Sequence, residues 1–206
     1  MCWIRKSLIG LTLGIFLATN GLAATYGPNS PSIFSNDDSV GTVAWTNPEN
    51  AASSDDVDAD VSPTGYPVSS YYLKACGFNF SIPYTERILG VLVEFEKDRQ
   101  STASFVDNSV VLWLSYKVSV DDKATGDGWP NADTYISHGG STDTWGQELT
   151  PAHINKNDFC TMISATQDSD PDRTASIDHI RVTVYTETIT VEVKNSTLKD
   201  SIIKGP

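Results

Sequence analysis

The sequence has few of the residues on which catalytic, metal-binding and nucleic-acid-binding sites usually depend. It contains 3 histidines and 3 cysteines in 206 residues, and 14 basic side chains against 26 acidic ones. The histidines, His138, His153 and His179, lie far apart and share no ligand spacing, so they form no zinc motif. The excess of acidic charge repels nucleic acid and anionic membranes, and we expect neither as a partner.

Motifs of the common hydrolases and nucleotide-binding enzymes are also missing. The chain has no Gly-x-Ser-x-Gly elbow, no His-Glu-x-x-His helix and no phosphate-binding loop. Glu94 and Glu96 lie on one face of an expected strand, which is typical of the paired carboxylates of a glycosidase. The same face continues into a polar loop after Lys97, however, so we interpret it as a solvated acidic surface. We therefore predict that the chain is not an enzyme.

The N-terminus resembles an export signal. Arg5 and Lys6 precede an apolar segment over residues 7–18, and small residues follow over residues 21–24. The apolar segment is shorter than the roughly 20 residues that span a bilayer, and no later segment is long enough. We predict a signal peptide over residues 1–24, cleaved after Ala23 or Ala24, and a secreted protein at the cell surface or in the extracellular space. The mature chain has about 182 residues, with 12 basic and 26 acidic side chains.

Two cysteines, Cys76 and Cys160, remain after this cleavage. An even pair in an oxidising compartment predicts one disulfide bond. Closing a loop of this length stabilises a fold by about 4 kcal/mol in the chain-entropy model. The alternative is a pair of buried free thiols, each on its own strand.

Strand patterns dominate the rest of the chain. Residues 176–185 alternate without a fault, with Ile180, Val182 and Val184 on one face and polar side chains on the other. Helical character is confined to one turn at residues 150–155, with Thr150 as N-cap and Pro151 at the first position. The pattern predicts an all-β chain folded as an antiparallel β-sandwich of jelly-roll type over residues 25–187. Further strands are expected over residues 40–45, 71–82, 88–97, 109–118, 158–166 and 188–193.

Many short phrases occur in an order that is similar to one recurring module. The chain resembles a single jelly-roll-like, galactose-binding-like β-sandwich found in secreted bacterial proteins and phage-related structural proteins. The resemblance covers roughly residues 28–186 and implies a fold, but no catalytic residues. Cys76 and Cys160 stand where the module has small apolar residues. The phrases lie at residues 41–48, 72–75, 78–83, 129–130, 133–135, 139–143, 145–146, 150–155, 158–159 and 176–185.

Two groups of residues are candidates for ligand binding. Asp56, Asp58 and Asp60 alternate along an extended segment and can direct carboxylate oxygens to one side, as Ca²⁺ prefers. The segment lacks the glycine and terminal glutamate of an EF-hand loop, so a solvated acidic loop is the alternative. Trp45, Trp129 and Trp145 lie near expected loops and can stack on sugar rings; the alternative is that they close the ends of the core.

The C-terminal segment at residues 188–206 contains a short alternating strand at residues 188–193. Such a strand can pair with the open edge of a neighbouring subunit and build a fibre. It can also be an ordinary edge strand, or the hairpin partner of the preceding strand with a turn at Glu187. Together these features predict a secreted, non-enzymatic structural or adhesive protein that assembles with itself. The alternative is a carbohydrate-binding module, stabilised by calcium, whose partner is a surface glycan.

Overall fold

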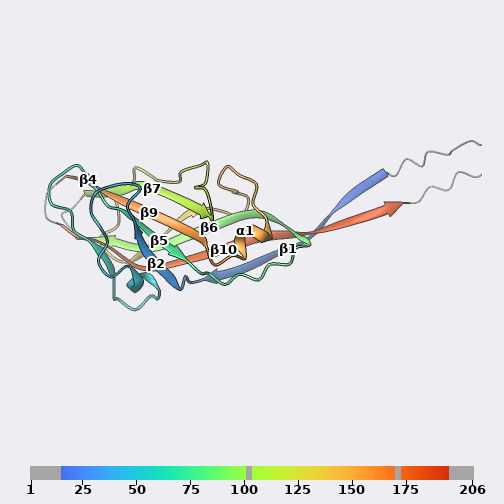
Figure 1. Cartoon of the computed structure of the whole chain (residues 1–206), viewed down its shortest axis with the longest axis horizontal. Coiled ribbons are helices and arrows are strands. Elements are labelled where there is room, and N and C mark those ends of the chain that lie inside the picture. The colour runs from blue at the N-terminus through green and yellow to red at the C-terminus, as the bar shows by residue number, and fades with distance from the viewer. Residues whose placement is uncertain (1–14, 101–103, 170–172, 195–206) are drawn as a thin grey trace, which may run out of the picture.

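Two antiparallel β-sheets lie face to face in the computed structural model, which describes residues 15–100, 104–169 and 173–194 (Figure 1). In the first sheet, here called sheet A, β10 is central, with β6 on one side and with β1 and β3 in succession along the other. Strand β8 forms the far edge beside β6. The strands of sheet A are β1 (Ile15–Asn29), β3 (Ala59–Val61), β6 (Glu86–Arg99), β8 (Thr134–Gly139) and β10 (Ala175–Lys194).

The second sheet, sheet B, is organised around β9 in the same way. Strand β7 pairs with one side of β9, while β5 and β4 follow one another on the other side and β2 pairs with β5. These strands are β2 (Ile33–Asp37), β4 (Val68–Ser69), β5 (Tyr72–Cys76), β7 (Ser104–Leu114) and β9 (Phe159–Ser169). The expected antiparallel β-sandwich is confirmed, and its jelly-roll connectivity stays a prediction.

The core lies between the two sheets because the strands alternate as the sequence predicts. Ile180, Val182 and Val184 of β10 are fully buried, as are Phe95 of β6 and Leu112 of β7. Two short helices, η1 (Pro48–Ala51) and α1 (Pro151–Ile154), lie in the connections between strands and bury Ala51 and Ile154 in the core. Helix α1 begins after Thr150 with proline at its first turn, as expected. No helix in the described part of the chain is long and apolar enough to cross a membrane.

Strand β10 is longer than the two separate strands expected at its position. It runs from Ala175 to Lys194 without a turn at Glu187, so the hairpin alternative for the C-terminal segment is wrong. Its pairing with β6 ends at Thr188 opposite Glu86, and beyond Ile189 the strand pairs with β1 alone. Figure 1 shows β1 and β10 leaving the body of the sandwich on the same side.

Strand β1 includes residues 15–24, the second part of the predicted signal peptide. Residues 1–14 and 195–206 lie outside the described part of the chain. Signal cleavage therefore stays a prediction, and the boundary proposed between residues 187 and 188 falls inside β10.

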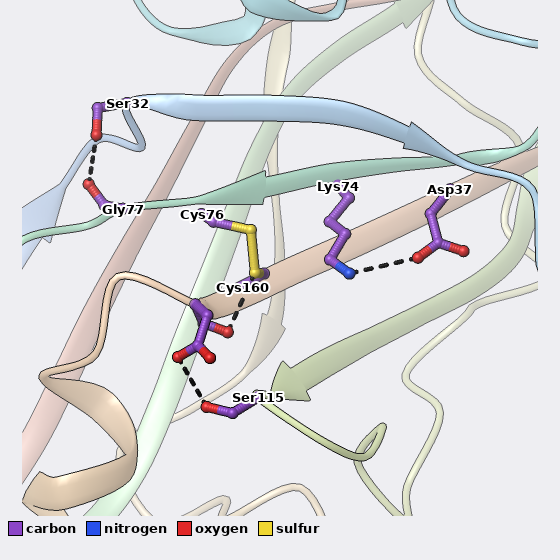
Figure 2. The surroundings of a disulfide bond; sticks show 8 residues. Ser32, Asp37, Lys74, Cys76, Gly77, Ser115 and Cys160 are labelled. Atoms are coloured by element: carbon purple, nitrogen blue, oxygen red, sulfur yellow. Dashed lines mark hydrogen bonds and ion pairs between the residues drawn. A yellow bond between two sulfur atoms is a disulfide. The ribbon is translucent and has the colours of Figure 1, made fainter.

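The expected disulfide bond joins Cys76 of β5 to Cys160 of β9 (Figure 2). These two cysteines are direct cross-strand neighbours in sheet B, with their Cα atoms 4.2 Å apart. Nearby, the hydroxyl of Ser32 donates to the carbonyl of Gly77, and Lys74 lies 3.3 Å from Asp37 across the β2–β5 pair. The disulfide therefore ties two strands within one sheet and does not join the two sheets.

The strand expected over residues 71–82 ends early, at Cys76. Gly77 and Asn79 both have positive φ angles, of 72° and 54°, which an extended strand cannot accommodate. Phe78, Phe80 and Ile82 are still buried, but they enter the core from a loop. The alternation of apolar residues therefore predicted the burial of these side chains correctly. It was wrong that their backbone continues the hydrogen-bonded strand.

Candidate functional site

A cleft of about 520 Å³ lies where β10 leaves the body of the sandwich. One wall is the start of β6 with Tyr84 before it, another is the loop that leads into α1, and Ile189 of β10 closes a third side. Tyr84 is 77% exposed and Ile189 is 50% exposed, so both present apolar surface to a ligand. Volumes of 300–1,000 Å³ are typical of ligand pockets. The cleft is lined by Tyr84, Glu86, Arg87, Ile88, Thr144, Gln147, Glu148, Leu149, Thr150, Pro151, Ala152 and Ile189.

The loop wall of the cleft is held in place by Trp145. Its indole N–H donates to the carbonyl of Val91 at 2.9 Å, and its backbone N–H donates to Asp143 at 2.8 Å. Trp145 and Gly146 both have positive φ angles, of 57° and 71°, so the chain turns sharply just before Gln147. A side chain at position 146 would also meet Asp121 at 2.6 Å, which explains the glycine there.

Gln147 is the most unusual residue of the cleft. Its amide nitrogen and amide oxygen are both buried, and neither has a hydrogen-bond partner in the described part of the chain. A buried polar atom without a partner costs about 1–3 kcal/mol. Because both atoms are closed off from solvent, a ligand with one acceptor and one donor would recover that free energy only if the Gln147 side chain turned toward the cleft. The cleft therefore suits a ligand that carries hydroxyl or amide groups beside an apolar face.

Glu86, by contrast, is already committed to protein partners. Its carboxylate accepts hydrogen bonds from the Tyr26 hydroxyl at 2.7 Å and from the Thr186 hydroxyl. The bond to Glu86, helped by burial, raises the pKa of Tyr26. Arg87 forms an ion pair with Glu187 at the rim. These contacts fix the polar side of the cleft and leave Gln147 as its unpaired group.

A second polar region covers the outer face of sheet A. There the guanidinium of Arg181 forms two hydrogen bonds with Glu94, at 2.8 and 2.9 Å, and lies 3.8 Å from the centre of the Tyr135 ring. Glu94 is therefore part of an ion pair on β6 and β10. One oxygen of Glu96 is buried without a partner among the described residues. The two glutamates share a face, as the sequence predicts, but they have different neighbours.

His179 joins this face to the N-terminal part of the chain. Its Nδ1 lies 2.7 Å from the Tyr135 hydroxyl and its Nε2 lies 2.8 Å from the Ser30 hydroxyl. Burial, more than any charge nearby, lowers the pKa of His179, so the neutral imidazole links two hydroxyl groups. No local motif announces this group, because Ser30 and His179 are 149 positions apart.

The aspartates proposed for calcium binding lie beside others from distant segments. Burial raises the pKa of Asp58 to about 6, and the charges of Asp133, Asp60, Asp178 and Asp98 add to the effect. Asp60 accepts a hydrogen bond from the hydroxyl of Ser176, and the charge of Asp56 contributes to a raised pKa of Asp133. Among the residues that the structure describes, no group of three or more His, Cys, Asp or Glu side chains is arranged to hold a metal ion. Calcium binding at Asp56, Asp58 and Asp60 stays a prediction.

The tryptophans proposed to stack on sugars are core residues. Trp45 is 3% exposed, Trp129 is 2% exposed and Trp145 is fully buried. Each indole N–H is also used, by the carbonyl of Tyr71, by Asp107 and by the carbonyl of Val91 respectively. No ring face is free for a ligand, so the expectation of a tryptophan platform is wrong. Their nearness to loops reflects closure of the core.

Sequence reasoning did not single out the cleft. Tyr84 and Gln147 stand in unremarkable polar segments, and what sets Gln147 apart is the lack of partners around it in space. The other histidines make unrelated contacts. His153 lies near Thr150 in α1, and His138 is buried between the sheets.

Comparison with known proteins gives little. No family model matches the chain, and no curated protein matches it either. Among solved structures, the chain is similar to the enzymatically active domain of tailspike protein 4 from bacteriophage CBA120, with a TM-score of 0.34 and 10% sequence identity. The match covers 84% of this chain and 20% of that chain, so this chain spans a fifth of its neighbour. A likeness at this TM-score carries no argument about function.

The prediction that the chain is not an enzyme nevertheless needs correction. The structural neighbour is described as enzymatically active, which contradicts it. We withdraw that prediction and assign no activity in its place.

Proposed function

We propose that this chain is an extracellular structural or adhesive subunit that assembles with copies of itself through the C-terminal part of β10. The observation that carries the proposal is the pairing of that segment. Among the residues that the structure describes, residues 189–194 of β10 pair with residues 15–20 of β1 and with no other strand. Those residues of β1 belong to the predicted signal peptide.

Cleavage after Ala23 or Ala24 would leave the end of β10 without a partner. The opposite edge is open over residues 190–194 in the described part of the chain, because β6 pairs with β10 only as far as Thr188 and the last bond on that side runs from the Ile189 N–H to the carbonyl of Thr85. A strand with two unpaired edges presents backbone N–H and C=O groups that readily pair with another chain. A second copy of the chain offers a strand of the same kind, so pairing between subunits would replace the lost β1.

Light scattering on three forms of the protein tests this proposal. The chain beginning at Thr25 is expected to form large assemblies, and the same chain without residues 190–206 is expected to be a monomer. That truncation keeps every β10–β6 pair, so the body should still fold. The matched control begins at Ile15 and retains β1, and it should also be a monomer. A monomeric chain from Thr25 to Pro206 would contradict the proposal.

Glycan binding in the cleft is the second candidate function. Its support is the unpaired amide of Gln147 beside the exposed ring of Tyr84, since sugars offer hydroxyl groups together with a flat apolar face. The carbohydrate-binding alternative that we predict from the sequence relies on the tryptophans. This second candidate places glycan binding in the cleft instead.

A panel of neutral and acidic oligosaccharides tests the second candidate. Binding, read by calorimetry, is expected to fall at least tenfold in Tyr84→Ala and in Gln147→Ala, because each change removes one of the two ligand contacts. Tyr116→Ala is the matched control, since Tyr116 is 65% exposed and lies outside the cleft. Equal binding by all three variants would place any glycan elsewhere.

A further inference from the structure

Three titratable side chains are buried between the two sheets. Lys97 comes from β6, Asp107 from β7 and His138 from β8. Their side chains are 2%, 0% and 1% exposed. Charged side chains are rarely buried to this extent, because the desolvation of an ion pair can exceed the attraction between its members. Lys97 and His138 belong to sheet A and Asp107 to sheet B, so the group bridges the two layers.

The contacts of Asp107 use both of its oxygens. Oδ1 lies 2.5 Å from the Lys97 ammonium nitrogen and accepts a hydrogen bond from the indole N–H of Trp129 at 2.9 Å. Oδ2 accepts hydrogen bonds from the backbone N–H and the hydroxyl of Thr125, at 3.3 and 3.4 Å. Nε2 of His138 lies 3.7 Å from the same Oδ2. The Trp129 ring covers the Lys97 nitrogen at 4.5 Å.

The two ring nitrogens of His138 differ in their hydrogen bonding. Nδ1 lies 3.0 Å from the carbonyl oxygen of Lys123, which can only accept, so the ring proton is on Nδ1. Nε2 is buried and has no hydrogen-bond partner in the described part of the chain. Burial, followed by the charge of Lys97, lowers the pKa of His138 and keeps the ring neutral. A basic nitrogen is therefore aimed at the carboxyl group of Asp107.

The same burial favours the neutral form of the lysine. Desolvation lowers the pKa of Lys97, and the nearby Asp107 opposes the shift. An amine is a nucleophile only when it is neutral, and dry surroundings are one way in which proteins activate a lysine. Transfer of one proton from Lys97 to Asp107 converts a buried ion pair into an amine facing a carboxylic acid. Condensation of the neutral amine with the neutral acid then makes the loss of both charges permanent and releases one water molecule.

We propose that Lys97 and Asp107 join in an intramolecular isopeptide bond, with His138 transferring the proton. The Lys97 nitrogen attacks Cγ of the protonated Asp107 carboxyl group. Nε2 of His138 takes a proton from the attacking nitrogen and delivers it to Oδ2, and Oδ2 leaves as water with this proton and the proton of the carboxyl group. One C–N bond forms and one C–O bond breaks, and no oxidant or other reactant is needed.

This cross-link differs from the disulfide in what it connects. The disulfide joins β5 to β9 within sheet B, whereas the Lys97–Asp107 bond would join β6 of sheet A to β7 of sheet B. The two sheets would then be joined to each other by a covalent bond. A subunit in an extracellular assembly gains resistance to unfolding from such a bond, but the inference stands without the proposed assembly.

The mass of the intact wild-type protein tests the inference directly. After reduction of the disulfide, the measured mass is expected to be lower than the sequence mass by one water molecule. Tryptic peptides should show Lys97 uncleaved and linked to the peptide that contains Asp107. Lys74 is the matched control, because it lies 3.3 Å from Asp37 in a partly exposed pair and should be cleaved normally. A full sequence mass with cleavage at Lys97 would overturn the proposal.

Variants then separate the roles of the three residues. Lys97→Arg and Asp107→Ala are expected to restore the full sequence mass. His138→Gln is expected to slow the loss of water at least tenfold in freshly made protein, followed by mass spectrometry over time, while circular dichroism confirms the fold. A wild-type rate in His138→Gln would exclude His138 as the proton-transferring group.

Discussion

Strands β1 and β10 run through both the body of the sandwich and the ribbon that leaves it, but they have different neighbours in the two regions. The ribbon consists of residues 15–20 of β1 and residues 189–194 of β10. In the body, β10 has neighbours on both sides and its inner face is fully buried. In the ribbon, each strand pairs only with the other within residues 15–100, 104–169 and 173–194. Two isolated strands are marginally stable in water. The body therefore stabilises itself, whereas the ribbon depends on its partner strand, and loss of that partner creates a binding edge.

A cavity in the body should have the largest effect on stability. Phe95→Ala removes a fully buried ring from β6 and is expected to lower the free energy of unfolding by about 3–5 kcal/mol. Ile189→Ala, in the half-exposed root of the ribbon, is the matched substitution and should cost about 1 kcal/mol or less. Urea denaturation measures both. Equal losses would show that the ribbon is as integral to the fold as the body.

Removal of the disulfide should come next. The double substitution Cys76→Ser and Cys160→Ser opens a loop that spans 84 positions and is expected to lower the free energy of unfolding by about 2–5 kcal/mol. Assembly through β10 should be unchanged, because the bond lies within sheet B. Reduction of the wild-type protein gives the same comparison without a substitution. A loss of assembly in the serine variant would connect the two regions in a way that the strand pairing does not.

The smallest effect should come from the buried aspartate of the body. The pKa of Asp58 is about 6, above its ordinary 3.8, so the folded state holds this proton more tightly than the unfolded state. The resulting stabilisation is complete below pH 4 and is lost as the pH rises to about 6. Asp58→Asn should therefore raise stability by about 1 kcal/mol at pH 7, after solvent screening is allowed for, and change little at pH 4. Thermal denaturation at both pH values, with exposed Asp38→Asn as control, decides this.

Much of the body can be predicted from the sequence, because the alternation of apolar and polar residues in its strands shows which side chains are buried. Residues 176–185 show this best, since all three of the predicted inward residues are buried. Prediction fails where a segment forms a strand only because a neighbouring strand pairs with it. The export-like segment at residues 15–24 becomes part of β1 only by pairing with β10, and residues 59–61, at the end of the aspartate-rich loop, form β3 for the same reason. The length of β10 is missed because the polar residues near Glu187 look like a turn.

The candidate sites are less predictable than the fold. The disulfide follows from cysteine count and compartment, and the structure confirms it. The tryptophans looked like ligand-binding residues because loops flank them, but sequence does not show which way a ring points. Gln147 and the Lys97–Asp107 pair stand out only through what surrounds them: the amide of Gln147 has no hydrogen-bond partner among the described residues, and both charged groups of the pair are buried.

Hydrogen exchange at the end of β10 tests the central claim most directly. In the chain that begins at Thr25, backbone amides of residues 189–194 are expected to be protected at high protein concentration and to exchange rapidly when the protein is diluted. Amides of β10 within the body, such as Val182, should be protected at both concentrations. That result would show that the segment is ordered by another copy. Exchange at residues 189–194 that is rapid at every concentration, or slow at every concentration, would contradict assembly through β10.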